Sequence, residues 1–221
     1  MTYILNIETA TKNCSVSLAA DGRTVALKEI SEEQFNHAEK LHIFIEDVLA
    51  EAGISLQNLD AVAVSKGPGS YTGLRIGVSS AKGLSYALNI PLIALDTLQV
   101  LAAGLKIDDG VIVPMIDARR MEVFTQVYST KSVPLTAAYA LIVDESAFRD
   151  TDGPVHLLGD GALKCRELLN TDKFKYHEEM VYPSAREMGS LSFKKYRSAE
   201  FEDVAYFEPF YLKDFMLTTK K

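Results

Sequence analysis

The sequence has few of the residues that typify secreted and metal-binding proteins. It contains two cysteines, Cys14 and Cys165, which lie far apart and outside any CxxC motif. This spacing argues against a cysteine-rich zinc site and is typical of a reducing compartment. The apolar runs are much shorter than the roughly 20 residues of a membrane-spanning helix, and the first residues, MTYILNIETA, lack the charged region of a signal peptide. We therefore expect a cytoplasmic protein that makes no use of a membrane.

Histidine is also scarce, and its spacing does not fit a metalloprotease. No two of the four histidines are four residues apart, as the H-E-x-x-H zinc motif requires. His37 and His42 are five apart, so they would lie about 140° apart around a helix. We expect no metal site, and a zinc peptidase is the least favoured of three functions that we consider.

Basic residues are outnumbered. The 30 Asp and Glu residues exceed the 23 Lys and Arg residues, and the formal net charge is −7. Binding to a nucleic-acid backbone depends on Lys and Arg side chains that neutralise phosphates. If the protein serves RNA or DNA, we expect it to do so through a partner.

Strands and helices alternate in the first hundred residues. Asp21-Gly22 stands between two strand-like runs and predicts a hairpin, while Gly53 and Pro91 mark the ends of two helices with apolar residues at helical spacing. Helical crossovers between the later strands predict that part of the sheet is parallel. The predicted strands are residues 3–8, 14–20, 24–30, 61–65 and 91–95; the predicted helices are residues 36–52, with Asn36 as N-cap, and 72–88.

The second half weakly repeats this opening. An apolar strand over 111–117 ends in an acid, as the strand over 3–8 ends in Glu8, and a turn and a second strand over 121–128 follow. This order predicts an α/β protein that arose by duplication of one unit. Further along, we predict a strand over 155–160, helices over 161–169 and 184–196, and an apolar segment over 208–216 that packs back onto one of the lobes.

Two polar segments could bind an anion. Glu8 ends a buried strand and precedes hydroxyl and amide side chains, and the later glycine loop leads into a helix N-terminus, which carries a partial positive charge. The loop fits neither the G-x-x-x-x-G-K-[ST] nor the G-x-G-x-x-G template. The structural alternative, polar turns that cap their own backbone, stays open. The candidate phosphate residues are Glu8, Thr9, Thr11, Asn13, Gly67, Gly69 and Ser70.

The helix after the glycine loop has small residues four apart, at Gly73, Gly77 and Ala81. Glycine inside a helix costs about 1 kcal/mol relative to alanine, so another backbone is expected to approach closely along this track. Either a neighbouring part of the same chain or a second subunit could provide that backbone.

Three stretches of the sequence resemble the TsaB (YeaZ) family: ILNIETATKNCSVSLAADG, NHAEKLHIFIEDVL and SKGPGSYTGLRIGVSSAKGLSYALNIPLIALDTL. The likeness is specific across residues 3–98 and looser later, where it resumes at VIVPMIDARRMEVF and PFYLKDF. It implies an actin/Hsp70-like (ribonuclease H-like) fold of two duplicated lobes, with mixed sheets flanked by helices. We expect residues 1–100 to form the first lobe, completed by 200–221, and residues 101–199 to form a smaller, degenerate second lobe.

The resemblance also implies a function. Members of this family are partners of TsaD, the catalytic subunit that attaches threonylcarbamoyl to an adenosine beside the tRNA anticodon, and TsaE joins the larger complex. The chain has Asp96-Thr97-Leu98-Gln99 where TsaD carries its metal-binding histidine pair, so a non-catalytic scaffold that activates TsaD is the favoured function. A weak ATPase, with ATP or ADP and magnesium held at the complex interface, is the alternative, and the older label glycoprotease-like corresponds to the zinc peptidase.

The residues of the implied interface lie on two helices. The same surface is expected to form a homodimer when TsaD is absent, and tRNA contact is expected to be indirect. Carried over from the family, the interface residues are His37, Glu39, Leu41, Ile45 and Leu49 on the first helix, and Thr72, Leu74, Arg75, Gly77, Val78, Ala81 and Lys82 on the second.

Overall fold

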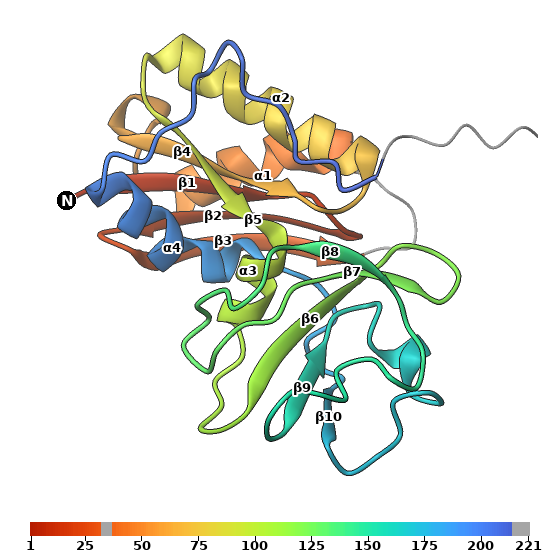
Figure 1. The fold of residues 1–221 in the computed structure, drawn as a ribbon. Helices are drawn as coiled ribbons and strands as arrows, with labels where there is room; N and C mark the ends of the chain where they lie inside the picture. Colours follow the sequence, from red (N-terminus) through yellow and green to blue (C-terminus); the bar gives the residue numbers. More distant parts are fainter. Residues whose placement is uncertain (32–36, 214–221) are drawn as a thin grey trace, which may run out of the picture.

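The computed structural model describes residues 1–31 and 37–213, which form two lobes, each built on a five-stranded sheet (Figure 1). Asn36 and residues 214–221, for which we predicted a helix cap and part of a lobe, lie outside the described residues.

The first sheet is mixed and has the strand order β3-β2-β1-β4-β5. Neighbours in the β3-β2-β1 half are antiparallel, and neighbours in the β1-β4-β5 half are parallel. The parallel half follows from the two predicted crossovers, α1 (His37–Glu51) and α2 (Tyr71–Leu88). Each crossover returns the chain to the end of the sheet where β1 begins, so β4 and β5 run in the same direction as β1. The strands are β1 Tyr3–Glu8, β2 Asn13–Ala20, β3 Arg23–Ser31, β4 Ala61–Gly67 and β5 Leu92–Asp96.

The second sheet repeats this topology. Its strand order is β10-β9-β6-β7-β8. Read from the other side, β8-β7-β6-β9-β10, it matches the first sheet strand for strand, with β6 in the place of β1. The corresponding neighbours are parallel in both sheets. Within the described chain, a single 3₁₀ turn, Leu163–Cys165, stands where α2 stands in the first lobe. The duplication inferred from the sequence is therefore clearer in the strand order than in the residues. The strands are β6 Val111–Asp117, β7 Glu122–Thr125, β8 Tyr139–Ile142, β9 Val155–Leu158 and β10 Phe174–His177.

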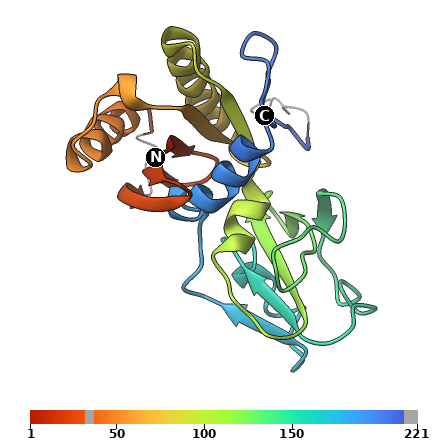
Figure 2. The same cartoon turned by 90° about the vertical axis from the view of Figure 1, so that its left-hand side faces the viewer.

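Helices cover both faces of the first sheet (Figure 2). Successive residues of a strand point to opposite faces. Leu5 and Ile7 of β1 therefore join the apolar core under α1 and α2, whereas Ile4 joins the core under α4 (Ala185–Arg197). All three of these side chains are fully buried, so β1 is the centre of the first lobe.

The two lobes exchange their last helices. α3 (Thr97–Ala103) follows the first sheet, but its Leu98 and Leu101 pack with Ile112 of the second sheet. α4 follows the second sheet, but its buried Met188 packs in the core of the first. The expected boundary places residues 185–197 in the second lobe, whereas α4 lies against β1, β2, β3 and β5 because its apolar side chains are buried there.

Most elements predicted from periodicity are present within one or two residues of the predicted bounds, including α1, α2, α4 and the strands of the first sheet. The predicted helix over 161–169 is wrong, because that segment forms turns around Leu163–Cys165. Four short elements, the 3₁₀ helix Leu56–Asn58, α3, β8 and β10, were not predicted.

Candidate functional site

The small residues of α2 face their own chain. A Cβ atom at Gly73 would collide with the carbonyl oxygen of Thr9, and one at Gly77 would collide with the Thr9 hydroxyl. Ala81 is fully buried in the core of the first lobe. Of the two alternatives that the sequence left open, a part of the same chain therefore provides the close neighbour at Gly73 and Gly77: it is the turn that follows β1.

Most of the predicted interface residues are likewise in the interior. Their side chains form the apolar stripes by which α1 and α2 pack on the sheet, because apolar residues at helical spacing turn toward the core. Of the predicted set, Glu39, Thr72 and Arg75 are exposed and Lys82 is half-buried. The buried members are His37, Leu41, Ile45, Leu49, Leu74, Gly77, Val78 and Ala81.

The solvent-facing side of the same two helices carries other unusual residues. Ile43 on α1 is 51% exposed, and Tyr86 on α2 is 83% exposed. Gly83, one turn before Tyr86, would meet nothing within 4 Å if it carried a Cβ. The fold itself thus gives no reason for a glycine there, although it costs about 1 kcal/mol in a helix. Sequence reasoning missed these residues because they are not among those carried over from the family resemblance, and the sequence does not show which glycine has empty space beside it.

A groove runs beside this part of α2. Lys82, Gly83 and Tyr86 line one wall, and residues 203–205 of the C-terminal segment line the other, enclosing about 690 Å³. The ammonium group of Lys82 fixes that segment by donating to the carbonyl oxygens of Ala205 (3.2 Å) and Phe207 (2.8 Å). Figures 1 and 2 show the segment running along α2. We refer to Gly83, Tyr86 and this groove as the outer face.

The two candidate phosphate segments meet each other. The Ser70 amide donates to the carbonyl of Ala10 (2.7 Å), and the Thr9 hydroxyl donates to the carbonyl of Gly73 (2.8 Å). A Cβ at Gly69 would collide with the same Ala10 carbonyl. The two segments are thus in direct contact, and two polar groups that could bind a phosphate, the Thr9 hydroxyl and the Ser70 amide, already have partners in the other segment. Of the candidate residues, Glu8, Thr9, Thr11, Asn13 and Gly67 are buried.

Glu8 lies at the centre of this contact and is fully buried. One carboxyl oxygen accepts a hydrogen bond from the Ala10 amide (2.7 Å). Removal from water disfavours the charged carboxylate, and this burial raises the pKa of Glu8 to about 7, against the lowering effect of its hydrogen bonds.

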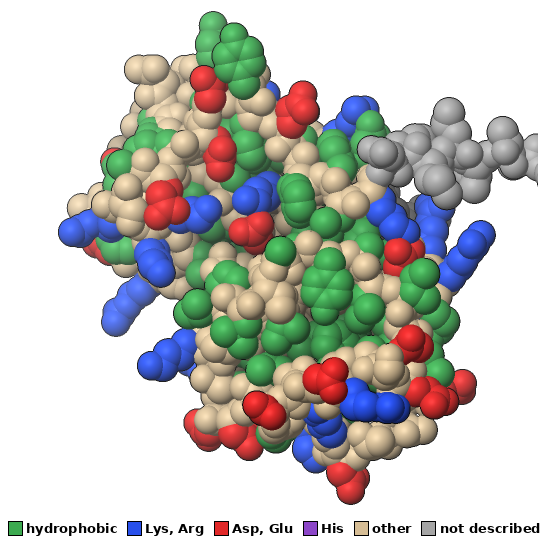
Figure 3. Space-filling view, viewed as in Figure 1, with side chains coloured by type: hydrophobic (Ala, Val, Ile, Leu, Met, Phe, Trp, Pro, Cys, Tyr) green, Lys and Arg blue, Asp and Glu red, His purple; other side chains and the backbone are tan. Residues whose placement is uncertain are grey.

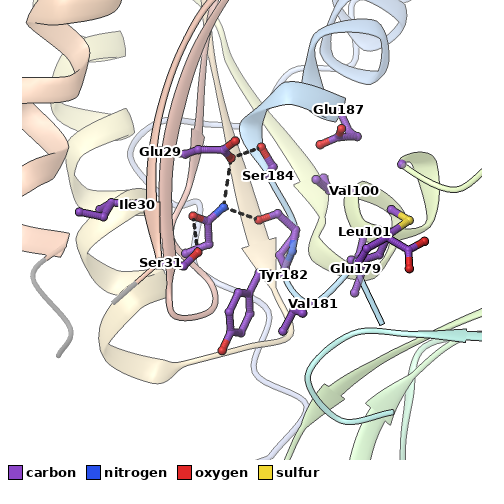
Figure 4. A pocket seen from close by; sticks show the side chains of 14 residues that line it. Glu29, Ile30, Ser31, Val100, Leu101, Glu179, Val181, Tyr182, Ser184 and Glu187 are labelled. Atoms are coloured by element: carbon purple, nitrogen blue, oxygen red, sulfur yellow. Dashed lines mark hydrogen bonds between the residues drawn. The ribbon is translucent and has the colours of Figure 1, made fainter. Parts of the chain in front are cut away.

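A cavity of about 510 Å³ lies between the lobes (Figure 4). Glu29, Glu179 and Glu187 contribute carboxyl groups to its lining, which contains no Lys or Arg among the described residues. Burial raises the pKa of Glu187. Asn13, predicted to contact phosphate, donates here to the Glu29 carboxylate (3.4 Å) and the Pro183 carbonyl (3.1 Å). One of these carboxylates, that of Glu29, is paired with the guanidinium of Arg186 (3.2 Å).

Exposed apolar side chains also occur on the second lobe. Val133, Leu135 and Ile142 are each more than half exposed. Figure 3 shows apolar surface in the middle of this lobe, with charged side chains around its rim. Exposed apolar residues are thus found on the second lobe as well as at Tyr86 on the outer face.

Metal ligands do not gather in the part of the chain that the structure describes. Across residues 1–31 and 37–213, no three His, Cys, Asp or Glu side chains are placed to hold a metal ion together. Over the same residues, no helix is both long and apolar enough to cross a membrane.

Comparison with known sequences gives consistent relatives. A family model described as TsaD, tRNA N6-adenosine threonylcarbamoyltransferase, matches residues 28–149. The tRNA threonylcarbamoyladenosine biosynthesis protein TsaB of Bacillus subtilis (strain 168) is 38% identical over 129 residues, which cover 58% of this chain and 56% of that protein. The match therefore spans about half the length of that relative. The TsaB protein of Buchnera aphidicola subsp. Schizaphis graminum is 30% identical over 193 residues, covering 84% of this chain and 90% of that protein.

Solved structures support the same grouping. The structure of YeaZ from Pseudomonas aeruginosa has a TM-score of 0.83 at 26% identity and covers 96% of this chain and 100% of that one. Other solved structures at 12% identity, with TM-scores of 0.51 and 0.50, share the fold. The predicted actin/Hsp70-like class, two mixed sheets flanked by helices, is confirmed.

Proposed function

The chain belongs to the TsaB family, and from this premise we propose that it is a non-catalytic scaffold in tRNA threonylcarbamoyladenosine biosynthesis. In this role it binds a TsaD-type threonylcarbamoyltransferase and holds it in an active arrangement. The outer face, rather than the buried stripe of α1 and α2, provides the contact.

The observation that carries this proposal is the unpartnered glycine. Gly83 opens the helix surface where the chain itself has nothing to place, and it stands beside an aromatic side chain that is 83% exposed at Tyr86. A missing Cβ allows a second helix to approach closely, and aromatic residues are enriched at the centres of interfaces. The glycine and the tyrosine together favour a protein ligand.

The same surface serves a homodimer when the TsaD-type partner is absent, because an isologous contact uses one self-complementary patch. A stable contact of either kind buries about 1,200–2,000 Å² in total. A TsaE-type ATPase joins through the assembled complex, and tRNA contact by this chain is indirect.

Gly83→Arg tests the proposal, since the space around residue 83 admits the side chain without disturbing the fold. We expect the variant to keep the unfolding midpoint of the parent and to lose co-elution with the TsaD protein of the same organism in size-exclusion chromatography. Ser190→Arg is the matched control, because Ser190 is exposed on α4, on the opposite side of the first sheet.

The two outcomes separate clearly. Loss of co-elution for Gly83→Arg but not for Ser190→Arg supports the outer face. Normal co-elution of a folded Gly83→Arg variant contradicts it. Gly77→Arg is unsuitable for this purpose, because a side chain there displaces Thr9 and disturbs the fold itself.

A further inference from the structure

The C-terminal segment reaches the second lobe at the last residue that the structure describes. The amide of Phe210 donates to the carbonyl of Lys66 on β4, in the first lobe (2.7 Å). The ammonium group of Lys213 forms an ion pair with the carboxylate of Glu122 on β7, in the second lobe. The chain therefore crosses from one lobe to the other between residues 210 and 213, and its described part stops beside the second sheet.

Glu122 stands next to an exposed apolar surface. It pairs in register with Ile142 of β8, and Phe124 pairs with Ala140. Side chains of directly paired residues lie on one face of the sheet, about 4.5–5.5 Å apart at Cβ, and residues two apart along a strand share that face. Ile142 is 72% exposed, and Phe124 and Ala140 are half-buried. We refer to Phe124, Ala140 and Ile142 as the β8 surface.

This surface belongs to the edge of the second sheet, because β8 is its outermost strand. Among residues 1–31 and 37–213, no strand pairs with the outer side of β8. An apolar edge strand presents unpaired backbone groups that can bind another chain, so native proteins cover such edges or place charges on them. β8 reads YALI and carries no charge, so we expect it to be covered.

The residues that follow Lys213 have the composition of such a cover. Residues 214–221, here called the tail, read DFMLTTKK, with Phe215, Met216 and Leu217 directly after one acid. An extended chain spans about 3.3–3.6 Å per residue, so Leu217 can reach about 14 Å from Lys213. Neighbouring strands are only about 4.8 Å apart, so these apolar residues can extend from β7 past β8.

The charges of the two segments are complementary. Lys220 and Lys221 follow the apolar residues of the tail, and Asp144 and Glu145 are exposed shortly after the end of β8. Exposed ion pairs contribute little to affinity, but complementary charges favour one orientation of a bound segment over the other. Charge therefore favours a course of the tail along β8 toward Asp144.

We propose that the tail binds the β8 surface of its own chain, with Phe215 and Leu217 against Ile142 and Phe124. Phe215 and Leu217 share one face of an extended segment, because alternate side chains of a strand point the same way. The removal of apolar area from water favours this contact, and the connection through Lys213 keeps the tail at a high local concentration. The C-terminal segment is then anchored on both lobes, and the β8 surface is closed to other proteins.

Disulfide trapping in the full chain tests this contact. Both native cysteines are buried, so thiols introduced at the surface react first. Ala140→Cys places one thiol on the β8 surface, and Met216→Cys places the other in the tail, while Phe215 and Ile142 stay in place. Under mild oxidation we expect a disulfide within one chain, seen as a monomer on a non-reducing gel and assigned by peptide mass.

Leu135→Cys combined with Met216→Cys is the matched control. Leu135 is 57% exposed on the second lobe, but its amide donates to the carbonyl of Val127, whose side chain packs in the core on the face opposite to Phe124. A thiol at this position meets the tail only by chance encounter, so we expect its disulfide to form about tenfold more slowly or less.

Methyl NMR of the full chain gives a second measurement that leaves the β8 surface unchanged. Phe215→Ser should move the Ile142 methyl resonances, because it removes an aromatic ring from beside them. Tyr206→Ser is the control. Tyr206 is 84% exposed on the same C-terminal segment, but it follows residues 203–205, which lie beside α2 in the first lobe. Its replacement should leave the Ile142 resonances in place.

Three results overturn the proposal. The first is an equal rate of disulfide formation from Ala140→Cys and from Leu135→Cys. The second is a disulfide that forms only between two chains, which assigns the β8 surface to the tail of a second copy. The third is an Ile142 methyl resonance that Phe215→Ser does not move.

Discussion

Two glycines of α2 should respond in opposite directions to the same substitution. Both lie inside the helix, so replacement by alanine gains about 1 kcal/mol of helix propensity at each. At Gly83 nothing lies within 4 Å of the new Cβ, and we expect this gain to appear in full as a rise of roughly 2–4 °C in Tm.

At Gly77 the gain is outweighed. The new Cβ overlaps the hydroxyl of Thr9, which is fully buried and donates to the Gly73 carbonyl at 2.8 Å. Displacing that hydroxyl loses a hydrogen bond of about 1 kcal/mol and adds about 1–3 kcal/mol of overpacking. The net expectation is a loss of about 1–3 kcal/mol, so the two variants should differ by about 2–4 kcal/mol.

Thr9→Ala identifies the cause. Without the hydroxyl, the remaining neighbours of a Cβ at Gly77 are Thr9 Cβ at 3.4 Å and Val64 Cγ2 at 3.5 Å, which are ordinary contacts. Gly77→Ala should therefore be harmless in the Thr9→Ala background. Urea unfolding of the four proteins of this double-mutant cycle measures the coupling, at two protein concentrations so that any effect of association is seen. A Gly77→Ala variant that is destabilised equally in both backgrounds, or stabilised in the parent, refutes the reasoning.

Three further predictions concern separate parts of the first lobe. Burial raises the pKa of Glu8 to about 7 in the folded protein, against an ordinary value of 4.5, so the folded state binds the proton more tightly. The free energy of unfolding should therefore fall by roughly 3 kcal/mol as pH rises from below 4.5 to above 7. Glu8→Gln should remove this pH dependence, and urea unfolding of both proteins across the range would show no growing difference if the idea is mistaken. Asn89 ends α2 in the left-handed region, with φ 52°. Asn89→Ala should therefore lower the free energy of unfolding by about 1 kcal/mol, whereas Asn89→Gly should be close to neutral. Equal midpoints of the two variants in thermal unfolding would count against the left-handed cap. Lys82→Met removes the two hydrogen bonds to the carbonyl groups of Ala205 and Phe207. Limited proteolysis of residues 203–207 should become faster, without a large change in Tm. An unchanged cleavage rate would mean that other contacts hold the segment.

The first lobe was predictable because its signals are local and strong. The Asp21-Gly22 turn, Gly53 and Pro91 mark the ends of long periodic segments, and the strands and helices between them formed as expected. The second lobe was less so. The apolar residues in 161–169 have helical spacing. Gly161, however, packs closely on β6 and β7: a Cβ there would lie 2.9 Å from Val123 Cγ1. The segment therefore follows the surface of these strands as a series of turns. A short helix gains too little from its own hydrogen bonds to resist such contacts.

Most of the predicted interface residues are buried for a related reason. Apolar spacing shows which side of a helix is buried, and on α1 and α2 the sheet of the same chain buries it. Residues available to a partner lie on the other side, where polar residues are normal and periodicity carries no signal. Only the coordinates separate Gly83, which has empty space beside it, from Gly77, which has none.

Three glycines whose Cβ position is blocked by other atoms explain why the glycine loop and the turn after β1 have the composition of a phosphate site. Gly69, Gly73 and Gly77 are four apart, and the atoms that a Cβ would strike belong in turn to Ala10, Thr9 and Thr9. Each glycine thus leaves room for the turn after β1 to pack against α2 and the loop before it. The hydroxyl and backbone groups of that turn then form hydrogen bonds to the glycine loop and to the first turn of the helix. A glycine loop and a polar turn at strand ends have the composition of a phosphate site, but here the Thr9 hydroxyl and the Ser70 amide also join the two segments to each other. Their pairing fixes the angle at which α2 leaves the sheet, and with it the position of the outer face.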